Sequence, residues 1–474
     1  MKVTIAKKEI NLNNVSVGLG FFGILGFIFF IYSIDYAILM LAFLLFLYAK
    51  FVRKIENIPS YLDLSILGVL AVLIPLLTTV VFKLPGYAIS AIGFAILITL
   101  LFENLELTFL FSIFISFLGA GIEGGNYNLG VSLFAGSITA AMLSYRVRRR
   151  FQVIRAGFLG GLVQFLAAFI MEREQSFFIL SGPDLNLFSV CFLNGIISAS
   201  LFAGILPFFE YIFKVVTNIS LLELSDFNNP LMRRLILEAP GTYQHSLVVA
   251  NLSESAAESI GANSLLARVG SYYHDIGKML KPEYFVENLV NCKDMHKKLK
   301  PSMSKLIIFN HVKEGAELAK KSHLNPKIID FIYQHHGKTL VYYFYQRAKM
   351  LEPEGKHEEE YRYPGPKPQS KETAIVALAD TIEALSRTLD EPNPSRIEEM
   401  VRDLVKKRFM EGELDESSLT LKDLEKITQS FIRVLNAMFH VRINYPKEEA
   451  RARFEDRRNK ENKNNNQNQK PPRE

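Results

Sequence analysis

The chain has 474 residues, 49% of them hydrophobic, and carries a net charge of +6. That length accommodates two or three domains, and the two cysteines, Cys191 and Cys292, are too few for a disulfide framework, which indicates a reduced, cytoplasmic setting for any soluble part. Because the positive charge lies partly in short loops and in the C-terminal tail, it does not indicate a DNA or RNA polymer as a partner.

Long apolar segments with few charges fill residues 15–213. A helix needs about 20 residues to cross the roughly 30 Å of hydrocarbon in a bilayer. Segments that meet or approach this length are 15–33, 36–52, 65–82, 86–102, 107–122, 129–145, 153–171 and 187–213. They predict a polytopic bundle of seven or eight helices in the lipid bilayer. The number depends on whether two segments separated only by ENLE at 103–106 count as one or two.

Basic residues lie at alternate ends of these segments. They precede the first segment, follow the second and follow the sixth, as Lys2, Lys7, Lys8, Lys50, Arg53, Lys54, Arg146, Arg148, Arg149, Arg150 and Arg155. Since Lys and Arg are enriched in the cytoplasmic loops of membrane proteins, this pattern predicts a multi-pass protein of the cell (inner) membrane. A cytoplasmic N-terminal segment, 1–14, would precede the bundle, 15–213, and both termini would be cytoplasmic.

The apolar segments contain almost no ionisable residue, which disfavours a transporter. Glu210 stands at the end of the last segment and is interpreted as a solvated interfacial charge. The glycine-rich stretch GFLGG at 157–161 is interpreted as a site of close helix packing.

Residues 214–450 have the mixed charge and the helical spacing of apolar positions that are typical of a soluble domain. The tail 451–474 is polar and low in complexity, and is predicted to be disordered. The predicted fold class is therefore all-α, with a polytopic membrane helix bundle followed by an all-helical cytoplasmic domain.

One helix of the soluble domain carries an adjacent histidine and aspartate, His274 and Asp275. We expect this helix to be capped by Asn263 or Ser264 and to continue through Ile276, because its apolar residues recur at helical spacing. Lys278 would then lie on the same helical face as His274.

Nine histidines occur in the chain, and five of them open or interrupt an apolar helical run. These five are His245, His274, His311, His335 and His336. Each alone is explained better by a satisfied core or capping role. Together with Asp275 and Asp380, however, they would leave many buried polar groups unsatisfied unless they shared a metal centre. The other four, His296, His323, His357 and His440, are interpreted as solvated or unexceptional.

The types of ligand narrow the choice of metal. Nitrogen and oxygen ligands without thiolate suit Mn²⁺ or Fe²⁺, and seven side chains exceed what one tetrahedral ion needs. Two divalent ions that share a carboxylate account for the set, with Asp275 as the bridge. Such a pair activates a water and neutralises charge in an in-line phosphoryl displacement. Lys278 is a candidate to hold a phosphate oxygen, and a cation at a helix C-terminus is the alternative interpretation.

Five short motifs occur in a characteristic order. They are GTYQHS at 241–246, HDIGK at 274–278, HV at 311–312, HHGK at 335–338 and LADTIEA at 378–384. With these motifs the chain resembles the HDIG branch of the HD-domain metal-dependent phosphohydrolases. The longer stretches LLELSDFNNPLMRRLILEAPGTYQHSL, ARVGSYYHDIGKMLKPEYFVEN and YRYPGPKPQSKETAIVALAD are similar to the bacterial seven-transmembrane HD phosphodiesterases.

This resemblance implies an enzyme of second-messenger signalling that cleaves cyclic di-AMP to linear pApA. It assigns one ion to His245, His274, Asp275 and Asp380, and the other to Asp275, His311, His335 and His336. Asp275 and Lys278 are the expected catalytic residues. The insert YRYPGPKPQSK is expected near the substrate, where Tyr363, Lys367 and Lys371 join Lys278 as candidate contacts to base or phosphate, although an ordinary surface loop explains each of the three as well.

The chain also departs from the family pattern. Larger members carry an extracytoplasmic sensor domain after the first span, whereas here 15–33 and 36–52 are joined by only a few residues. GK follows the histidine pair where many relatives have GT. The GYP signature of the cyclic di-GMP-cleaving branch is absent after HHGK, which favours cyclic di-AMP.

Two alternatives remain open. One is an HD phosphohydrolase of another nucleotide, such as cyclic di-GMP or a nucleoside polyphosphate. The other is a membrane receptor that binds a nucleotide without turning it over. The sequence also leaves open whether two chains form a homodimer.

Overall fold

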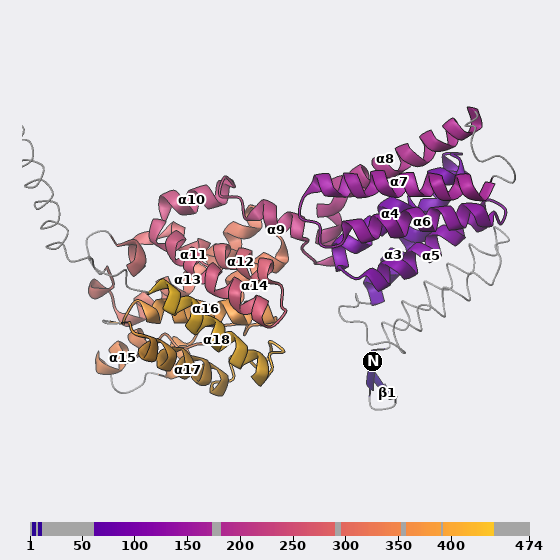
Figure 1. The fold of residues 1–474 in the computed structure, drawn as a ribbon. Helices are drawn as coiled ribbons and strands as arrows, with labels where there is room; N and C mark the ends of the chain where they lie inside the picture. The colour runs from indigo at the N-terminus through magenta and orange to yellow at the C-terminus, as the bar shows by residue number, and fades with distance from the viewer. Residues whose placement is uncertain are drawn as a thin grey trace, which may run out of the picture. The chain divides into compact units, whose positions relative to one another are not determined.

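The computed structural model describes residues 2–5, 8–11, 61–172, 182–289, 295–351, 357–389 and 392–439. Within these residues the fold is helical (Figure 1), apart from a short hairpin in which β1 (Lys2–Ile5) pairs antiparallel with β2 (Lys8–Asn11). The hairpin was not predicted. The predicted spans 15–33 and 36–52, His440 and the tail 451–474 lie outside the described residues.

Two compact units divide the chain. The first comprises Met1–Ser246, Arg268–Tyr333 and Leu340–Tyr361, and the second comprises Leu247–Ala267, Gln334–Thr339 and Arg362–Glu474. The predicted domain boundaries at 213 and 450 stay predictions.

The apolar helices of the first unit match the predicted segments closely. They are α3 (Tyr61–Leu76) with its π-helical extension η2 (Leu77–Val81), the 3-10 turn η3 (Gly86–Ala88), α4 (Ala91–Phe102), α5 (Leu105–Ile122), α6 (Tyr127–Ser144), α7 (Arg150–Glu172) and α8 (Gly182–Phe213). By length and composition, four helical segments among the described residues can cross a membrane: Leu62–Val81, Leu105–Ile122, Arg150–Glu172 and Pro183–Phe213. The apolar segment Gly86–Phe102 is shorter.

The turn between α4 and α5 shows that ENLE separates two helices. Glu103 adopts a left-handed conformation with φ of 48°, which ends α4. The side chain of Asn104 then accepts a hydrogen bond from the Leu107 amide at 2.9 Å and caps α5. The two apolar segments are therefore distinct helices joined by a tight turn.

Buried amide side chains support the non-helical backbone that precedes α4. Gln164 donates from Nε2 to the Tyr87 carbonyl at 2.8 Å, and Asn194 donates from Nδ2 to the Ile89 carbonyl at 3.0 Å. Irregular backbone inside an apolar bundle needs such partners because no water is available to satisfy it. This explains why the predicted span 86–102 is an irregular segment followed by a short helix.

Glycines allow α7 to pack closely against α8, which lies beside it in Figure 1. A Cβ atom on Gly157 would lie 2.3 Å from the Gly195 carbonyl oxygen, and one on Gly161 would lie 2.7 Å from the Cys191 carbonyl oxygen. The prediction that GFLGG serves close helix packing is confirmed, since no larger residue fits at these two positions.

Glu210 is buried, and its interpretation as a solvated interfacial charge is wrong. Its side chain is near the end of α8, only 4% of the residue is exposed, and Oε1 accepts from the Thr217 amide at 2.8 Å. Oε2 accepts from the Ser220 hydroxyl at 2.8 Å. Both donors belong to the start of α9 (Asn218–Leu224), so the carboxylate joins the last apolar helix to the first helix of the soluble region.

We expect Glu210→Ala to destabilise this junction. The substitution leaves the buried Thr217 amide and the half-buried Ser220 hydroxyl without their acceptor, which costs about 1–3 kcal/mol. The measurement is thermal unfolding of the protein in detergent, with Glu238→Ala as the control. Glu238 accepts from Arg234 on an exposed helix surface, where such a pair contributes only about 0.3–0.5 kcal/mol. Equal unfolding temperatures for the two variants would contradict the junction's role.

The region after residue 213 is built of α-helices of varied length and short 3-10 helices. They are α10 (Pro230–Glu238), α11 (Pro240–Ser259), α12 (Ser264–Tyr273), η4 (Ile276–Leu280), η5 (Pro282–Tyr284), η6 (Val286–Asn288), η7 (Met295–Lys298), α13 (Pro301–Lys321), α14 (Pro326–Gln334), α15 (Tyr342–Leu351), η8 (Glu358–Tyr361), α16 (Lys371–Ser386), α17 (Pro394–Met410) and α18 (Leu421–Met438). The predicted all-helical character is confirmed for the described part of this region.

Candidate metal centre

The His274–Asp275 pair lies at a break between two helices. The Asn263 side chain accepts from the Leu266 amide at 2.9 Å and caps α12, as predicted. The helix ends at Tyr273, however, and a 3-10 helix, η4, begins at Ile276. The prediction of one continuous helix through Ile276 is therefore wrong, and Lys278 does not share an α-helical face with His274.

The break follows from a close backbone contact between η4 and α13. A Cβ atom on Gly277 would lie 1.9 Å from the His311 carbonyl oxygen and 2.7 Å from the Gly315 amide nitrogen. Only glycine permits this approach. It brings the turn that carries Asp275 directly against the helix that carries His311.

Backbone carbonyls orient two of the imidazoles. His274 Nδ1 lies 2.7 Å from the Ser271 carbonyl oxygen, and His311 Nδ1 is bonded to the Ile308 carbonyl. In each ring Nδ1 must donate, so Nε2 keeps its lone pair and is available as a ligand. Both residues are buried, with His274 fully so.

The Asp275 carboxylate is divided between histidines on different helices. Its Oδ2 lies 3.2 Å from His274 Nε2 and 3.6 Å from His245 Nε2, which belongs to α11. Its Oδ1 lies 3.3 Å from His311 Nε2, on α13. Asp275 itself is only 1% exposed. Each carboxylate oxygen thus faces a different set of ring nitrogens.

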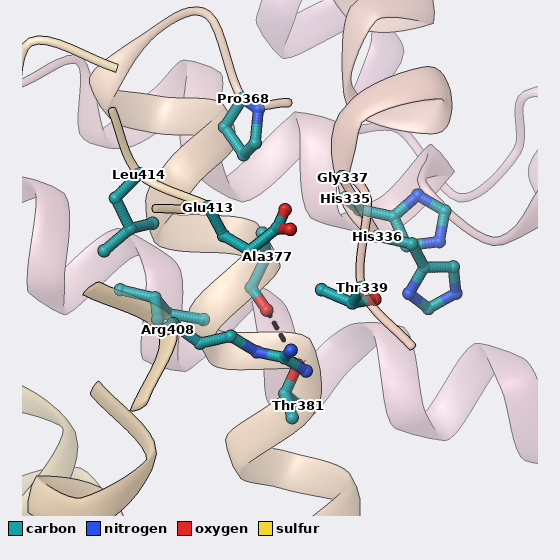
Figure 2. A pocket seen from close by; sticks show the side chains of 11 residues that line it. His335, His336, Gly337, Thr339, Pro368, Ala377, Thr381, Arg408, Glu413 and Leu414 are labelled. Atoms are coloured by element: carbon teal, nitrogen blue, oxygen red, sulfur yellow. Dashed lines mark hydrogen bonds between the residues drawn. The ribbon is translucent and has the colours of Figure 1, made fainter. Parts of the chain in front are cut away.

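The remaining three candidates lie together in the second unit. His335 and His336 follow α14 with ring centroids 4.0 Å apart. His336 Nδ1 lies 3.6 Å from Oδ2 of Asp380, which is buried on α16. Gly337 follows with φ of 53°, and the Lys338 amide donates to Glu413 at 2.9 Å. Figure 2 shows Glu413 beside Gly337, with the His335 and His336 rings on the other side of the backbone at this turn.

Two sets of four side chains could each hold a metal ion. In each set one ligand atom per residue lies within 4.8 Å of the others; the sets are His245, His274, Asp275 and Asp380, and Asp275, His311, His335 and His336. All the ligand atoms are imidazole nitrogens or carboxylate oxygens, which suits a borderline or hard divalent ion. The donor chemistry and the burial fit a pair of metal ions that share Asp275.

Lys278 lies at this site although the helix that was expected to place it ends earlier. Its Nζ is 2.7 Å from Asp275 Oδ2 and 2.9 Å from Glu287 Oε1. Burial and the nearby Asp275 raise the pKa of the Glu287 carboxyl, but the charge and hydrogen bond of Lys278, together with a backbone hydrogen bond, hold that pKa below its ordinary value. Glu287 was not predicted as a site residue, because it belongs to an irregular segment with no periodic pattern.

The candidate substrate contacts have different surroundings. The Tyr363 ring stacks on the His336 ring, with centroids 4.3 Å apart and an interplanar angle of 26°. Lys367 Nζ donates to the Gly412 carbonyl at 2.7 Å, and Lys371 Nζ lies 3.1 Å from an Asp423 oxygen. Tyr363 therefore borders a candidate ligand, whereas both lysines bind residues after α17.

One further histidine differs from its interpretation. His296 is 8% exposed, its Nε2 lies 2.9 Å from the Tyr284 carbonyl oxygen, and its ring lies against Phe344. It is a buried histidine and not a solvated one. His323 and His357 are exposed, in keeping with their unexceptional role.

Comparison with known proteins matches both halves of the chain. Residues 15–217 match the family model described as "7TM receptor with intracellular HD hydrolase", and residues 242–385 match the HD domain model. The chain is 39% identical over 368 residues to the cyclic-di-AMP phosphodiesterase PgpH of Bacillus subtilis, which covers 76% of this chain and 51% of that protein. The PgpH of Listeria monocytogenes is 39% identical over 357 residues, which covers 75% of this chain and 49% of that protein.

The chain spans about half the length of these curated relatives. A crystal structure of the L. monocytogenes PgpH HD domain in complex with cyclic di-AMP is 47% identical, with a TM-score of 0.43; the match covers 46% of this chain and 100% of that one.

Proposed function

Since the chain belongs to the family of 7TM receptors with an intracellular HD hydrolase, we propose that it is a membrane-bound, metal-dependent phosphodiesterase that hydrolyses cyclic di-AMP to linear pApA. The observation that carries this proposal is the division of the Asp275 carboxylate, whose two oxygens face separate histidines. A carboxylate divided in this way can bridge the two ions of a site for phosphoryl chemistry.

The proposed ligands are the two sets that meet at Asp275, one with His245, His274 and Asp380 and the other with His311, His335 and His336. Two divalent ions in such a site supply an activated water and stabilise the charge that develops on the phosphoryl group. The HD domain family binds divalent metals, and the absence of thiolate among the ligands favours Mn²⁺ or Fe²⁺.

The chain's own residues would position the phosphodiester. His274 and His311 are held by backbone carbonyls, so their ligand nitrogens need no reorganisation. Lys278 carries the cation nearest Asp275 and is proposed to bind a phosphate oxygen. Tyr363, which stacks on His336 and is 8% exposed, is proposed to contact an adenine base. Lys367 and Lys371 are weaker candidates because each already binds a carbonyl or carboxylate.

The choice of cyclic di-AMP is supported by the names of the two PgpH relatives and by the absence of a GYP signature after HHGK. The soluble region is proposed to face the cytoplasm, where the basic loops of the bundle also lie. Cyclic di-GMP and nucleoside polyphosphates remain the alternative substrates, and a nucleotide receptor without turnover is the alternative activity.

We expect the full chain, purified anaerobically in detergent and loaded with Mn²⁺ or Fe²⁺, to convert cyclic di-AMP to pApA. Chromatographic separation of the two nucleotides measures the reaction, and metal analysis should find about two ions per chain. Cyclic di-GMP serves as the control substrate and should be cleaved much more slowly. Faster cleavage of cyclic di-GMP would contradict the substrate assignment, and binding without cleavage of either nucleotide would support a receptor.

A further inference from the structure

Lys278 is held from two sides by carboxylates. Its Nζ contacts Asp275 at 2.7 Å and Glu287 at 2.9 Å, and it also lies over the Phe285 ring, 5.1 Å from the centroid. The side chains of Lys278 and Glu287 are only 13% and 14% exposed, so water screens their attraction weakly. In the proposed site both Asp275 oxygens would serve as metal ligands. Glu287 is then the carboxylate that remains to pair with Lys278.

Glu287 is itself fixed by the helix that carries His245. Thr242 Oγ1 donates to Glu287 Oε1 at 3.2 Å, and the Thr242 amide donates to Asn288 Oδ1 at 3.0 Å. Asn288 returns a hydrogen bond from Nδ2 to Thr242 Oγ1 at 2.9 Å. A Cβ atom on Gly241 would lie 1.9 Å from the Glu287 carbonyl oxygen, so this contact also requires glycine at 241.

These contacts connect the candidate ligand His245 to the candidate ligand Asp275. Thr242 stands one helical turn before His245 on α11, and Lys278 stands one 3-10 turn after Asp275. Resting on the proposed function, we propose that Glu287 is a positioning residue of the phosphodiesterase: it holds the Lys278 ammonium where that cation meets the phosphate oxygen of the substrate. Glu287 touches neither substrate nor metal in this role and acts through Lys278.

The first test is independent of turnover. In metal-loaded protein without nucleotide, the rate at which Lys278 is acylated by a lysine-reactive ester is followed by mass spectrometry of its peptide. Glu287→Ala should raise this rate several-fold, because Lys278 then loses the Glu287 contact that holds its side chain where it is only 13% exposed. The control is Glu283→Ala, which removes an exposed carboxylate from the same segment and should leave the rate unchanged. An unchanged rate in Glu287→Ala would overturn the proposal.

The second test uses the reaction. Glu287→Ala should lower kcat/KM for cyclic di-AMP by roughly 10–100-fold, as the loss of a supporting partner does, with the metal content unchanged. Glu287→Gln keeps the hydrogen bonds but loses the charge, so its kcat/KM should lie between those of the wild-type chain and Glu287→Ala. If Glu287→Ala fails to fold, Glu287→Gln replaces it in the test. Addition of Glu287→Ala to Lys278→Ala should cost nothing more, and an additive loss would refute the role.

The two tests separate this proposal from the proposed function. Faster acylation of Lys278 in Glu287→Ala supports the pairing even if the wild-type chain cleaves no cyclic di-AMP, in which case the proposed function fails and the pairing stands. Normal turnover in Glu287→Ala alongside an active wild-type chain would overturn the positioning role and leave the proposed function standing.

Discussion

Asp275→Ala is expected to abolish cyclic di-AMP hydrolysis and to remove metal from both ligand sets. Loss of one member of a catalytic set typically costs more than about 10³-fold in turnover. Here one side chain faces His274 and His245 with one oxygen and His311 with the other. The expected metal content therefore falls well below one ion per chain and not merely by half. Metal analysis and the nucleotide assay on the same preparation measure the two effects.

The matched control is Asp403→Ala, which removes an exposed carboxylate from α17. Its metal content and turnover should equal those of the wild-type chain. Asp275→Asn serves as a second variant, since it keeps the size of the side chain and removes its charge. If Asp275→Ala kept one tightly bound ion and measurable turnover, the bridging role would be wrong and two independent sites would have to be considered.

The sequence indicated the candidate ligands better than it indicated the helices that carry them. His245, His274, His311, His335, His336 and Asp380 were grouped with Asp275 because polar residues in apolar helical runs need partners, and all seven occur in the two candidate metal sets. That argument depends on residue type and order alone. It needs no knowledge of where each helix begins or ends, which is why it survives the wrong helix end at Tyr273.

Three unpredicted features depend on contacts between different helices or turns, which the pattern of one segment does not record. The break after α12 is imposed by the approach of Gly277 to the His311 carbonyl, and hydrophobic periodicity carries no record of such a contact. Glu210 looked like a solvated charge at a helix end, yet it accepts hydrogen bonds from the next helix, at Thr217 and Ser220. Glu287 is identified as a site residue by its contact with Lys278, which the sequence pattern does not indicate.

For the membrane helices as well, composition predicts the segments but not the contacts that shape them. Composition predicted the apolar segments, and the bounds of α5, α7 and α8 agree with them within a few residues. It did not predict that 86–102 is only partly helical, because that depends on Gln164 and Asn194 reaching the carbonyls of Tyr87 and Ile89. Whether an apolar stretch forms a full span is decided by its neighbours as well as by its own hydropathy.

Gly277→Ala is expected to have the second-largest effect, because this single methyl group tests the break in the helix. The added Cβ would lie 1.9 Å from the His311 carbonyl oxygen and 2.7 Å from the Gly315 amide nitrogen, both backbone atoms that cannot rotate away. Overpacking of this kind costs about 1–3 kcal/mol and occasionally more. We expect η4 to separate from α13, which moves Asp275 away from His311, so that metal is lost from the set that contains His311.

Metal analysis and thermal unfolding measure these effects, and turnover should fall with the metal content. Gly204→Ala is the control, since a Cβ atom at this helical glycine would meet no atom within 4 Å. The variant Gly277→Ala also distinguishes the two descriptions of residues 274–278. In a continuous helix alanine is more favourable than glycine by about 1 kcal/mol, so a more stable, fully metallated variant would show that Lys278 shares a helical face with His274. A less stable, metal-depleted variant is what the contact with α13 requires.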